Sequence, residues 1–246
     1  MQKEWEQLQA QIEELYRQGR YRELVPLMER AVRLTGELHG LGSLTYAAML
    51  NDYGGVHRDI GNYHQAEGAF LEAKALLLAV TGERDLNYGN TLNNLAGLYR
   101  LMGQWDKAES MFLQALAMYQ ELLGEEHFLT VSGLNNLGLL YQDMGKYTQA
   151  ETLHRQCLAL IHRSEENEIA CATTLNNLAS ALRAQGKLAD AGPLLTEALA
   201  IYERILGREH SLYAYGLNNL AAYYFSISSF DQAADCYYQS LASCRK

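Results

Sequence analysis

The sequence predicts an all-α solenoid built from about six helix-turn-helix units. The first observation is an internal repeat, because the tetrapeptide Leu-Asn-Asn-Leu recurs at intervals of 42, 41 and 42 residues, with a degenerate copy 42 residues ahead. The second is the helical spacing of apolar residues inside each repeat, with no alternation typical of strands. The leading leucines of the five copies are Leu50, Leu92, Leu134, Leu175 and Leu217.

A weaker sixth copy is expected at the N-terminal end. Leu8 is followed by Gly19, Tyr21, Leu24 and Ala31 at the spacings of the other copies. This predicts a first unit at about 1–36. The remaining units are predicted at about 43–82, 85–124, 127–163, 168–207 and 210–246, and the six units together form one solenoid domain over 1–246.

Each unit begins with a helix that carries one apolar face. In the third unit, Leu92, Leu95, Ala96 and Tyr99 fall at i, i+3, i+4 and i+7. Gly103 then predicts a tight stop, since glycine readily adopts the left-handed conformation that ends a helix.

The second helix of each unit repeats the helical spacing. In the third unit it carries Ala108, Phe112, Ala115 and Leu116, and the small alanines allow the two helices to approach closely. A left-handed glycine is expected to end this helix. The candidate glycines are Gly36, Gly82, Gly124 and Gly207.

Composition and charge exclude several classes of protein. The chain is 48% apolar, and its net charge is −9, which disfavours non-specific binding to nucleic acid or to an anionic membrane. The longest apolar runs have six residues, against the roughly 20 that a membrane-spanning helix needs. The acidic start lacks the pattern of a signal peptide, and four scattered cysteines do not form a disulfide scaffold. We therefore expect a cytoplasmic protein with reduced thiols.

These residues resemble the tetratricopeptide repeat, and the long period resembles the kinesin light chain type of that repeat. The turns Gly124-Glu125-Glu126-His127 and Gly207-Arg208-Glu209-His210 match this type, although Phe128 and Ser211 stand where it has proline. The resemblance covers nearly the whole chain. It implies a right-handed superhelix whose first helices line a concave wall, and a protein or peptide as the partner.

No motif for chemistry is found, so we expect no catalytic residue, no metal and no cofactor. His154 and Cys157 are three residues apart on one helix, but sister units hold Phe112 and Ala115 there, which favours packing. His127 and His210 align with Ser43, Asp85 and Glu168, which indicates a position that caps a helix.

Paired asparagines inside the first helices are unusual, because each asparagine lowers the stability of a helix by roughly 0.6 kcal/mol relative to alanine. One interpretation is that they bond neighbouring helices and hold the stack in register. The other, implied by the resemblance, is that they hold the backbone of an extended peptide. The candidate peptide-binding asparagines are Asn93, Asn94, Asn135, Asn136, Asn176, Asn177 and Asn219.

A stripe that varies between units lies beside the apolar face of each first helix. It carries Arg58, Arg100 and Arg183 at equivalent places, with Gln142 in the fourth unit. Three arginines in an acidic protein predict a groove more basic than the rest of the surface. A solvated face is the alternative for any one of them.

The sequence therefore predicts a non-catalytic interaction module that binds an extended, acidic peptide in its concave groove. The alternative is a regulatory or oligomerising scaffold that uses its ends or its convex face; an enzyme is the remaining option. No nucleic acid or membrane partner is expected. The last helix, about Asp231 to Lys246, carries Tyr237, Tyr238 and Leu241, which suggests self-association through that helix.

Overall fold

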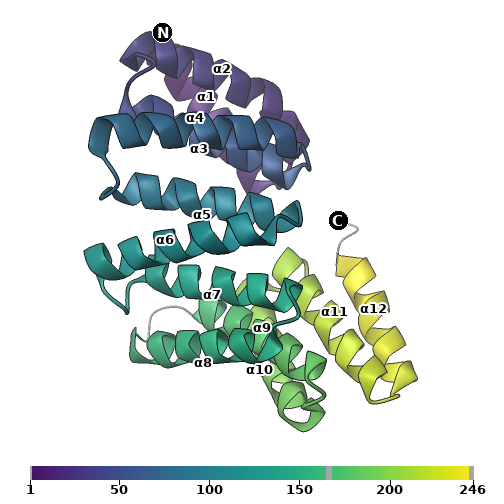
Figure 1. The fold of residues 1–246 in the computed structure, drawn as a ribbon. Coiled ribbons are helices and arrows are strands. Elements are labelled where there is room, and N and C mark those ends of the chain that lie inside the picture. Colours follow the sequence, from purple (N-terminus) through teal and green to yellow (C-terminus); the bar gives the residue numbers. More distant parts are fainter. Residues whose placement is uncertain (1, 165–167, 244–246) are drawn as a thin grey trace. The chain divides into compact units, whose positions relative to one another are not determined.

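The computed structural model describes residues 2–164 and 168–243, and over these residues the chain forms twelve α-helices and no strand (Figure 1). The helices fall into two compact units, Met1–Leu122 and Leu123–Lys246, hereafter unit 1 and unit 2. Unit 1 contains α1 (Gln2–Arg17), α2 (Tyr21–His39), α3 (Leu44–Asp59), α4 (Tyr63–Thr81), α5 (Leu86–Leu101) and nearly all of α6 (Trp105–Leu123). Unit 2 contains α7 (Phe128–Asp143), α8 (Tyr147–Ser164), α9 (Glu168–Ala184), α10 (Leu188–Leu206), α11 (Ser211–Ser226) and α12 (Phe230–Ser243).

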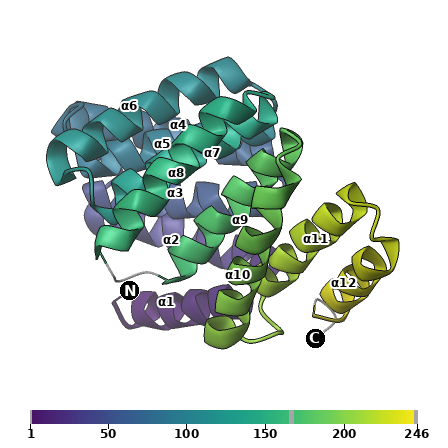
Figure 2. The same ribbon diagram turned by 90° about the horizontal axis from the view of Figure 1, so that it is seen from below.

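Helices that follow one another in sequence pack together. In unit 1, α3 contacts both α2 and α4, and in unit 2 the series runs without a break from α7 to α12. The first helices of successive repeats also touch, since α3 contacts α5, and α9 contacts both α7 and α11. Figure 2 shows this order for α9, α11 and α12, with α12 on the side of α11 away from α9.

The turn inside each helix pair takes the predicted left-handed residue. Gly103 has φ +71°, and Ser228, which replaces glycine in the last pair, is forced to φ +61°. A side chain at positive φ is strained, because its Cβ approaches the neighbouring carbonyl oxygen. The last turn therefore holds the same geometry as the others at a conformational cost.

One predicted cap was wrong. Gly36 lies inside α2, which continues to His39, and Gly40 ends the helix with φ +86°. The four residues that precede the second repeat extend the first helix pair beyond the predicted limit at residue 36. Gly82, Gly124 and Gly207 have positive φ at their predicted positions.

The predicted capping position is confirmed at four helix starts. The side chains of Ser43 and Asp85 accept hydrogen bonds from backbone N–H groups in the first turns of α3 and α5. The Nδ1 atoms of His127 and His210 do the same for Leu129 and Leu212, at 3.2 and 3.1 Å. Each of these side chains satisfies an N–H group that the helix itself cannot.

The core lies between the two helices of each pair, where small residues face large ones. Adding a Cβ to Gly54 would place it 2.6 Å from the ring of Phe70, and at Gly138 it would lie 2.6 Å from the ring of His154. Ala108 is fully buried at the close approach of its helix pair. No described helix is long and apolar enough to cross a membrane.

Candidate functional site

The first helices of two successive repeats border a cavity in unit 2. Its volume is about 710 Å³, and it opens between the N-terminal halves of α7 and α9, with Ile161 of α8 at its inner end. Phe128, Ser132 and Asn135 line it from α7, while Ile169 and Thr173 line it from α9. The α7 residues fall at i, i+4 and i+7, and the two α9 residues fall at i and i+4, so each set forms one stripe.

The cavity exists because two side chains on α9 are small. Ala170 occupies the position that holds Leu129 in the preceding repeat and Leu212 in the following one. Thr173 occupies the position of Tyr215, whose ring reaches back toward the preceding first helix and donates a hydrogen bond to Asn177 Oδ1 at 3.3 Å. Without these larger side chains, the space between α7 and α9 stays open.

The lining combines apolar and hydrogen-bonding groups. Val131 and Ile161 are buried in its wall, and Phe128 is 67% exposed at its rim, beside the ring of His127 at 4.6 Å. Asn135 supplies an amide, and Ser132 a hydroxyl. Such a surface suits an apolar side chain together with the polar backbone that carries it.

The asparagine pairs form a hydrogen-bonded rung between α7 and α9. Asn177 is 2% exposed; its Nδ2 donates to Asn135 Oδ1 at 3.2 Å, while its Oδ1 accepts from Tyr215. In unit 1, Asn51 Nδ2 donates to Thr91 Oγ1 at 2.7 Å. These bonds join helices of successive repeats, as the stacking interpretation expects.

The corresponding rung between α9 and α11 is open. By repeat position, Asn219 would donate to Asn176 as Asn177 donates to Asn135. Instead, the Nδ2 of Asn219 and both amide atoms of the fully buried Asn176 have no hydrogen-bond partner among the described residues. Buried amides without partners are unfavourable, so this junction is less well satisfied than the one between α7 and α9.

Gln142 is tied into the interior of unit 2. Its Nε2 lies 3.2 Å from the backbone oxygen of Asn177, to which it donates, and 2.8 Å from His154 Nε2. Because one amide nitrogen serves both contacts, His154 Nε2 acts as the acceptor and the imidazole proton sits on Nδ1. Burial lowers the pKa of His154 to about 4, so the ring is neutral at pH 7.

The three predicted arginines differ in their surroundings. Arg58 pairs with Asp59, with Nη2 2.9 Å from Oδ1, so much of its charge is offset. Arg100 on α5 is half-buried and engaged in interactions of its own. Arg183 on α9 is half-buried, and its side chain forms no hydrogen bond or ion pair with any of the described residues. Arg183 is therefore the arginine most available to a ligand.

The remaining predicted residues lie on the first helices as expected, and all of them are half-buried. They are Asn93 and Asn94 on α5, Asn136 on α7 and Asn219 on α11. Thus the structure brings Asn135, Asn177 and Gln142 together in unit 2, while Asn93, Asn94, Arg58 and Arg100 belong to unit 1.

Sequence reasoning missed the residues that make the cavity. Phe128, Ser132, Ile169 and Thr173 extend the variable stripes of α7 and α9 toward their N-termini by one and two turns. Following the stripe beyond the asparagine would have found them. The small residue Ala170 could also have been noticed between two leucines at equivalent positions.

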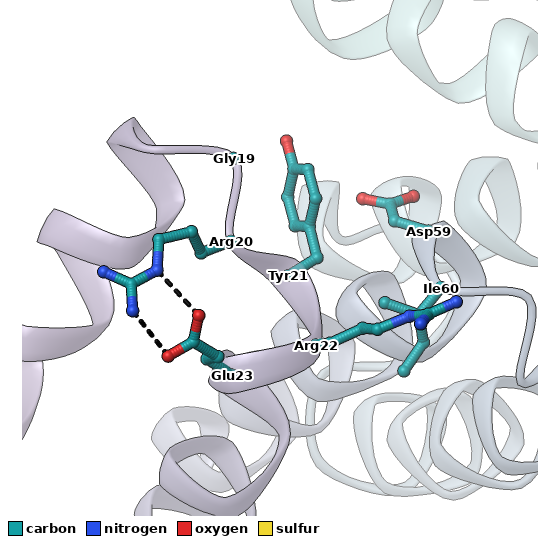
Figure 3. A pocket seen from close by; sticks show the side chains of 7 residues that line it. All are labelled: Gly19, Arg20, Tyr21, Arg22, Glu23, Asp59 and Ile60. Carbon is teal, nitrogen blue, oxygen red and sulfur yellow. Dashed lines mark hydrogen bonds and ion pairs between the residues drawn. The ribbon is translucent and has the colours of Figure 1, made fainter. Parts of the chain in front are cut away.

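A second cavity, of about 420 Å³, lies at the turn between α1 and α2 in unit 1 (Figure 3). Arg20 and Glu23 in its lining are paired with each other, with Nε and Nη2 donating to the two carboxylate oxygens at 2.7 and 2.6 Å. This pairing neutralises both groups, and their side chains are half exposed to solvent. Arg20 and Glu23 therefore leave little charge for a ligand in this cavity.

The described residues contain no group of three or more His, Cys, Asp or Glu side chains that could hold a metal ion. His154 and Cys157 are both buried, as the packing interpretation expects, and the Cys157 thiol faces the backbone oxygen of Val131 at 3.5 Å. Burial raises the pKa of Cys157 to about 12, which keeps the thiol protonated and unreactive.

Comparison with known proteins agrees with the helical repeat fold described above. No curated protein matches the sequence. Among solved structures, BtubC (BKLC) from P. vanneervenii is 21% identical with a TM-score of 0.70, covering 91% of this chain and 90% of that one. The putative kinesin light chain repeats of Podosopora anserina are 20% identical with a TM-score of 0.64, covering 83% and 99%.

A Rap protein complexed with competence and sporulation factor is 16% identical with a TM-score of 0.67, covering 99% of this chain and 77% of that one. These likenesses establish the fold as an all-α repeat solenoid of the kinesin light chain type. The tetratricopeptide repeat family itself matches residues 87–161 and 170–246, which is more than half of the sequence. The chain belongs to the tetratricopeptide repeat family.

Proposed function

We propose that this chain is a non-catalytic module that binds an extended, acidic segment of a partner protein along the first helices of its repeats. The observation that carries the proposal is the cavity between the stripes of α7 and α9, where apolar walls and polar groups face the same space. The family supports it, because tetratricopeptide repeats generally serve as scaffolds for protein–protein interaction.

The cavity accounts for one end of the bound segment. An apolar side chain of the partner enters between Val131, Ile161 and Ile169 and leaves water. The amide of Asn135 and the hydroxyl of Ser132 face the partner's backbone, whose N–H and C=O groups need hydrogen bonds once they are desolvated. This arrangement selects an extended chain, because a helix satisfies its own backbone groups.

Arg183 accounts for the acidic end. It follows Thr173 by ten residues on α9, which places it about 15 Å further along the helix axis. An extended peptide covers that distance in about five residues at roughly 3.3 Å each. The partner is therefore expected to carry a carboxylate about five residues from its apolar anchor. In unit 1, the equivalent stripes carry Arg58, Arg100 and Asn94, and we propose them as a separate surface for an acidic segment.

The test begins with selection of peptides from a random library displayed on phage, using the whole chain as bait. The selected peptides should contain an apolar residue and an Asp or Glu about five positions away. A synthetic, fluorescently labelled copy of the best peptide is then titrated by fluorescence anisotropy. Selection of basic peptides, or of no peptide, would contradict the proposal.

Two variants locate the peptide on the structure. Ala170→Leu installs the leucine of both neighbouring repeats and should fill the cavity and weaken binding at least tenfold. Arg183→Ala should also weaken binding about tenfold, with a smaller loss at high salt. Arg208→Ala is the control, since it removes the same charge from an exposed turn where Arg208 pairs with Glu203. If Arg183→Ala and Arg208→Ala lose the same amount of peptide affinity, the effect comes from the net charge of the protein and not from a contact with Arg183.

A further inference from the structure

The last described helix carries an apolar stripe that none of the other described helices covers. Phe230, Ala234, Tyr237 and Leu241 lie at i, i+4, i+7 and i+11 on α12, with Tyr238 beside them. Phe230, Tyr237, Tyr238 and Leu241 are 58%, 44%, 73% and 57% exposed. A contiguous apolar stripe of this kind is often an interaction surface.

The preceding repeat shows what covers such a stripe. The residues 42 positions earlier on α10 are Gly192, Leu195 and Leu199, and Leu195 is only 1% exposed. The next helix, α11, lies against them: a Cβ on Gly192 would meet the Tyr223 hydroxyl at 2.5 Å, and one on Gly216 would meet Leu199 at 3.2 Å. The occupant of the α12 stripe is therefore a helix with an apolar face.

The first helix of the chain does not provide that face. On α1, Leu8 is buried against the rest of unit 1, whereas Glu6, Gln9 and Glu13 are exposed. Stacking the α1 helix of a second copy on α12 would place these polar groups against aromatic rings and desolvate them without partners. The α12 stripe of a second copy, in contrast, is itself apolar and uncharged.

The exposed area is sufficient for a dimer. With the exposed fractions of Phe225, Phe230, Tyr237 and Tyr238, and about 200 Å² per aromatic side chain, the patch offers roughly 500 Å² per copy. The Phe225 and Phe230 rings lie 5.4 Å apart, so the patch continues from α12 onto the end of α11. Two copies would bury roughly 1,000 Å² from these side chains alone, which reaches the lower limit for specific interfaces.

We propose that two copies of this chain associate tail to tail, with the α12 stripe of one copy packed against the α12 stripe of the other. A two-fold axis places the same patch on both sides of the contact, so the assembly closes at two copies and does not extend into a filament. The cavity between α7 and α9 and the Arg183 side chain, proposed above as the peptide site, contribute no residue to this contact. The proposal is thus independent of the ligand.

Sedimentation velocity of the 246-residue chain at rising concentration tests the proposal. We expect a monomer–dimer equilibrium and no larger species. The double variant Tyr237→Glu, Leu241→Glu should raise the dimer dissociation constant by about 100-fold, because each charge would be desolvated without a partner. The control Leu113→Glu, Leu122→Glu changes two leucines on α6 that are 46% and 41% exposed, and it should leave the equilibrium unchanged.

Three results would overturn the proposal. If the chain is a monomer at every concentration up to about 100 µM, the α12 stripes of two copies do not associate. A series of species that grows with concentration would indicate a head-to-tail contact that does not close. A dimer that survives the α12 double variant, with the fold of that variant confirmed by circular dichroism, would place the contact elsewhere.

Discussion

Replacing Asn177 by alanine distinguishes the two interpretations of the asparagine pairs. The change removes the bond that Nδ2 donates to Asn135 and the bond that Oδ1 accepts from Tyr215. At about 0.5–1.5 kcal/mol each, the two bonds contribute roughly 1–3 kcal/mol. Alanine has a higher helix propensity than asparagine, which offsets roughly 0.6 kcal/mol of this loss. We expect the free energy of unfolding to fall by about 1–2 kcal/mol.

Asn218 provides a matched control for the same substitution. It lies in the interior of α11, it is exposed, and its side chain forms no hydrogen bond with any of the described residues. Asn218→Ala should therefore gain roughly 0.6 kcal/mol from helix propensity alone. Urea denaturation followed by circular dichroism measures both variants, and their midpoints should move in opposite directions.

The same two variants are then titrated with the selected peptide. If Asn177 holds the stack in register, Asn177→Ala lowers stability and leaves the dissociation constant within about twofold. The reasoning fails if Asn177→Ala and Asn218→Ala have equal effects on the midpoint, because the rung would then contribute nothing. A loss of affinity without a loss of stability would assign Asn177 to the ligand instead.

Three further predictions concern the core and charges. Gly138→Ala should destabilise the chain by about 1–3 kcal/mol, because its Cβ would meet His154, whereas Gly97→Ala has open space and should be neutral or stabilising in thermal melts. Burial lowers the pKa of His154 to about 4, so the unfolded chain binds more protons than the folded chain between pH 6.5 and 4. The free energy of unfolding should therefore fall as the pH drops through that range. His154→Phe should reduce this dependence on pH in denaturant titrations. Hydrogen bonds from Lys187, and from the other partners of Glu151, lower the pKa of Glu151 to about 2, so its contribution to stability is present above pH 4.5 and lost toward pH 2. Glu151→Gln should cost at most about 1 kcal/mol of stability at pH 7, because solvent screens the Lys187 side chain, which is 44% exposed, and nothing at pH 2.

Local features of the fold were predictable because they depend on neighbours in sequence. Ser43, Asp85, His127 and His210 cap helices where the repeat register placed them, since a cap needs only a side-chain acceptor and the N–H groups that follow it. The mistaken cap at Gly36 arose where residues inserted before the second repeat lengthened α2. There the local glycine pattern and the actual helix end differ by four residues.

The candidate site was only partly predictable. The stripe that contains Asn135 and Arg183 follows from helical periodicity, which is a property of one helix. The cavity depends on side-chain volumes from α7, α8 and α9 together, above all on the small Ala170 and Thr173. The burial of Asn176 likewise depends on what packs over it, and one helix cannot indicate this.

The strained Ser228 turn also has a consequence for how the chain opens. A residue other than glycine at positive φ costs about 1 kcal/mol, and only this turn among the five asparagine-bearing repeats carries that cost. Before this turn, the expected hydrogen bond between Asn219 of α11 and Asn176 of α9 is not formed. After it, α12 carries the exposed apolar stripe described above. Cooperative opening of a repeat array starts where a repeat has the fewest stabilising neighbours. Within unit 2, the backbone amides of the α11–α12 hairpin are therefore expected to exchange with solvent before those of α7 to α10, and tail-to-tail pairing would act on stability as well as on assembly.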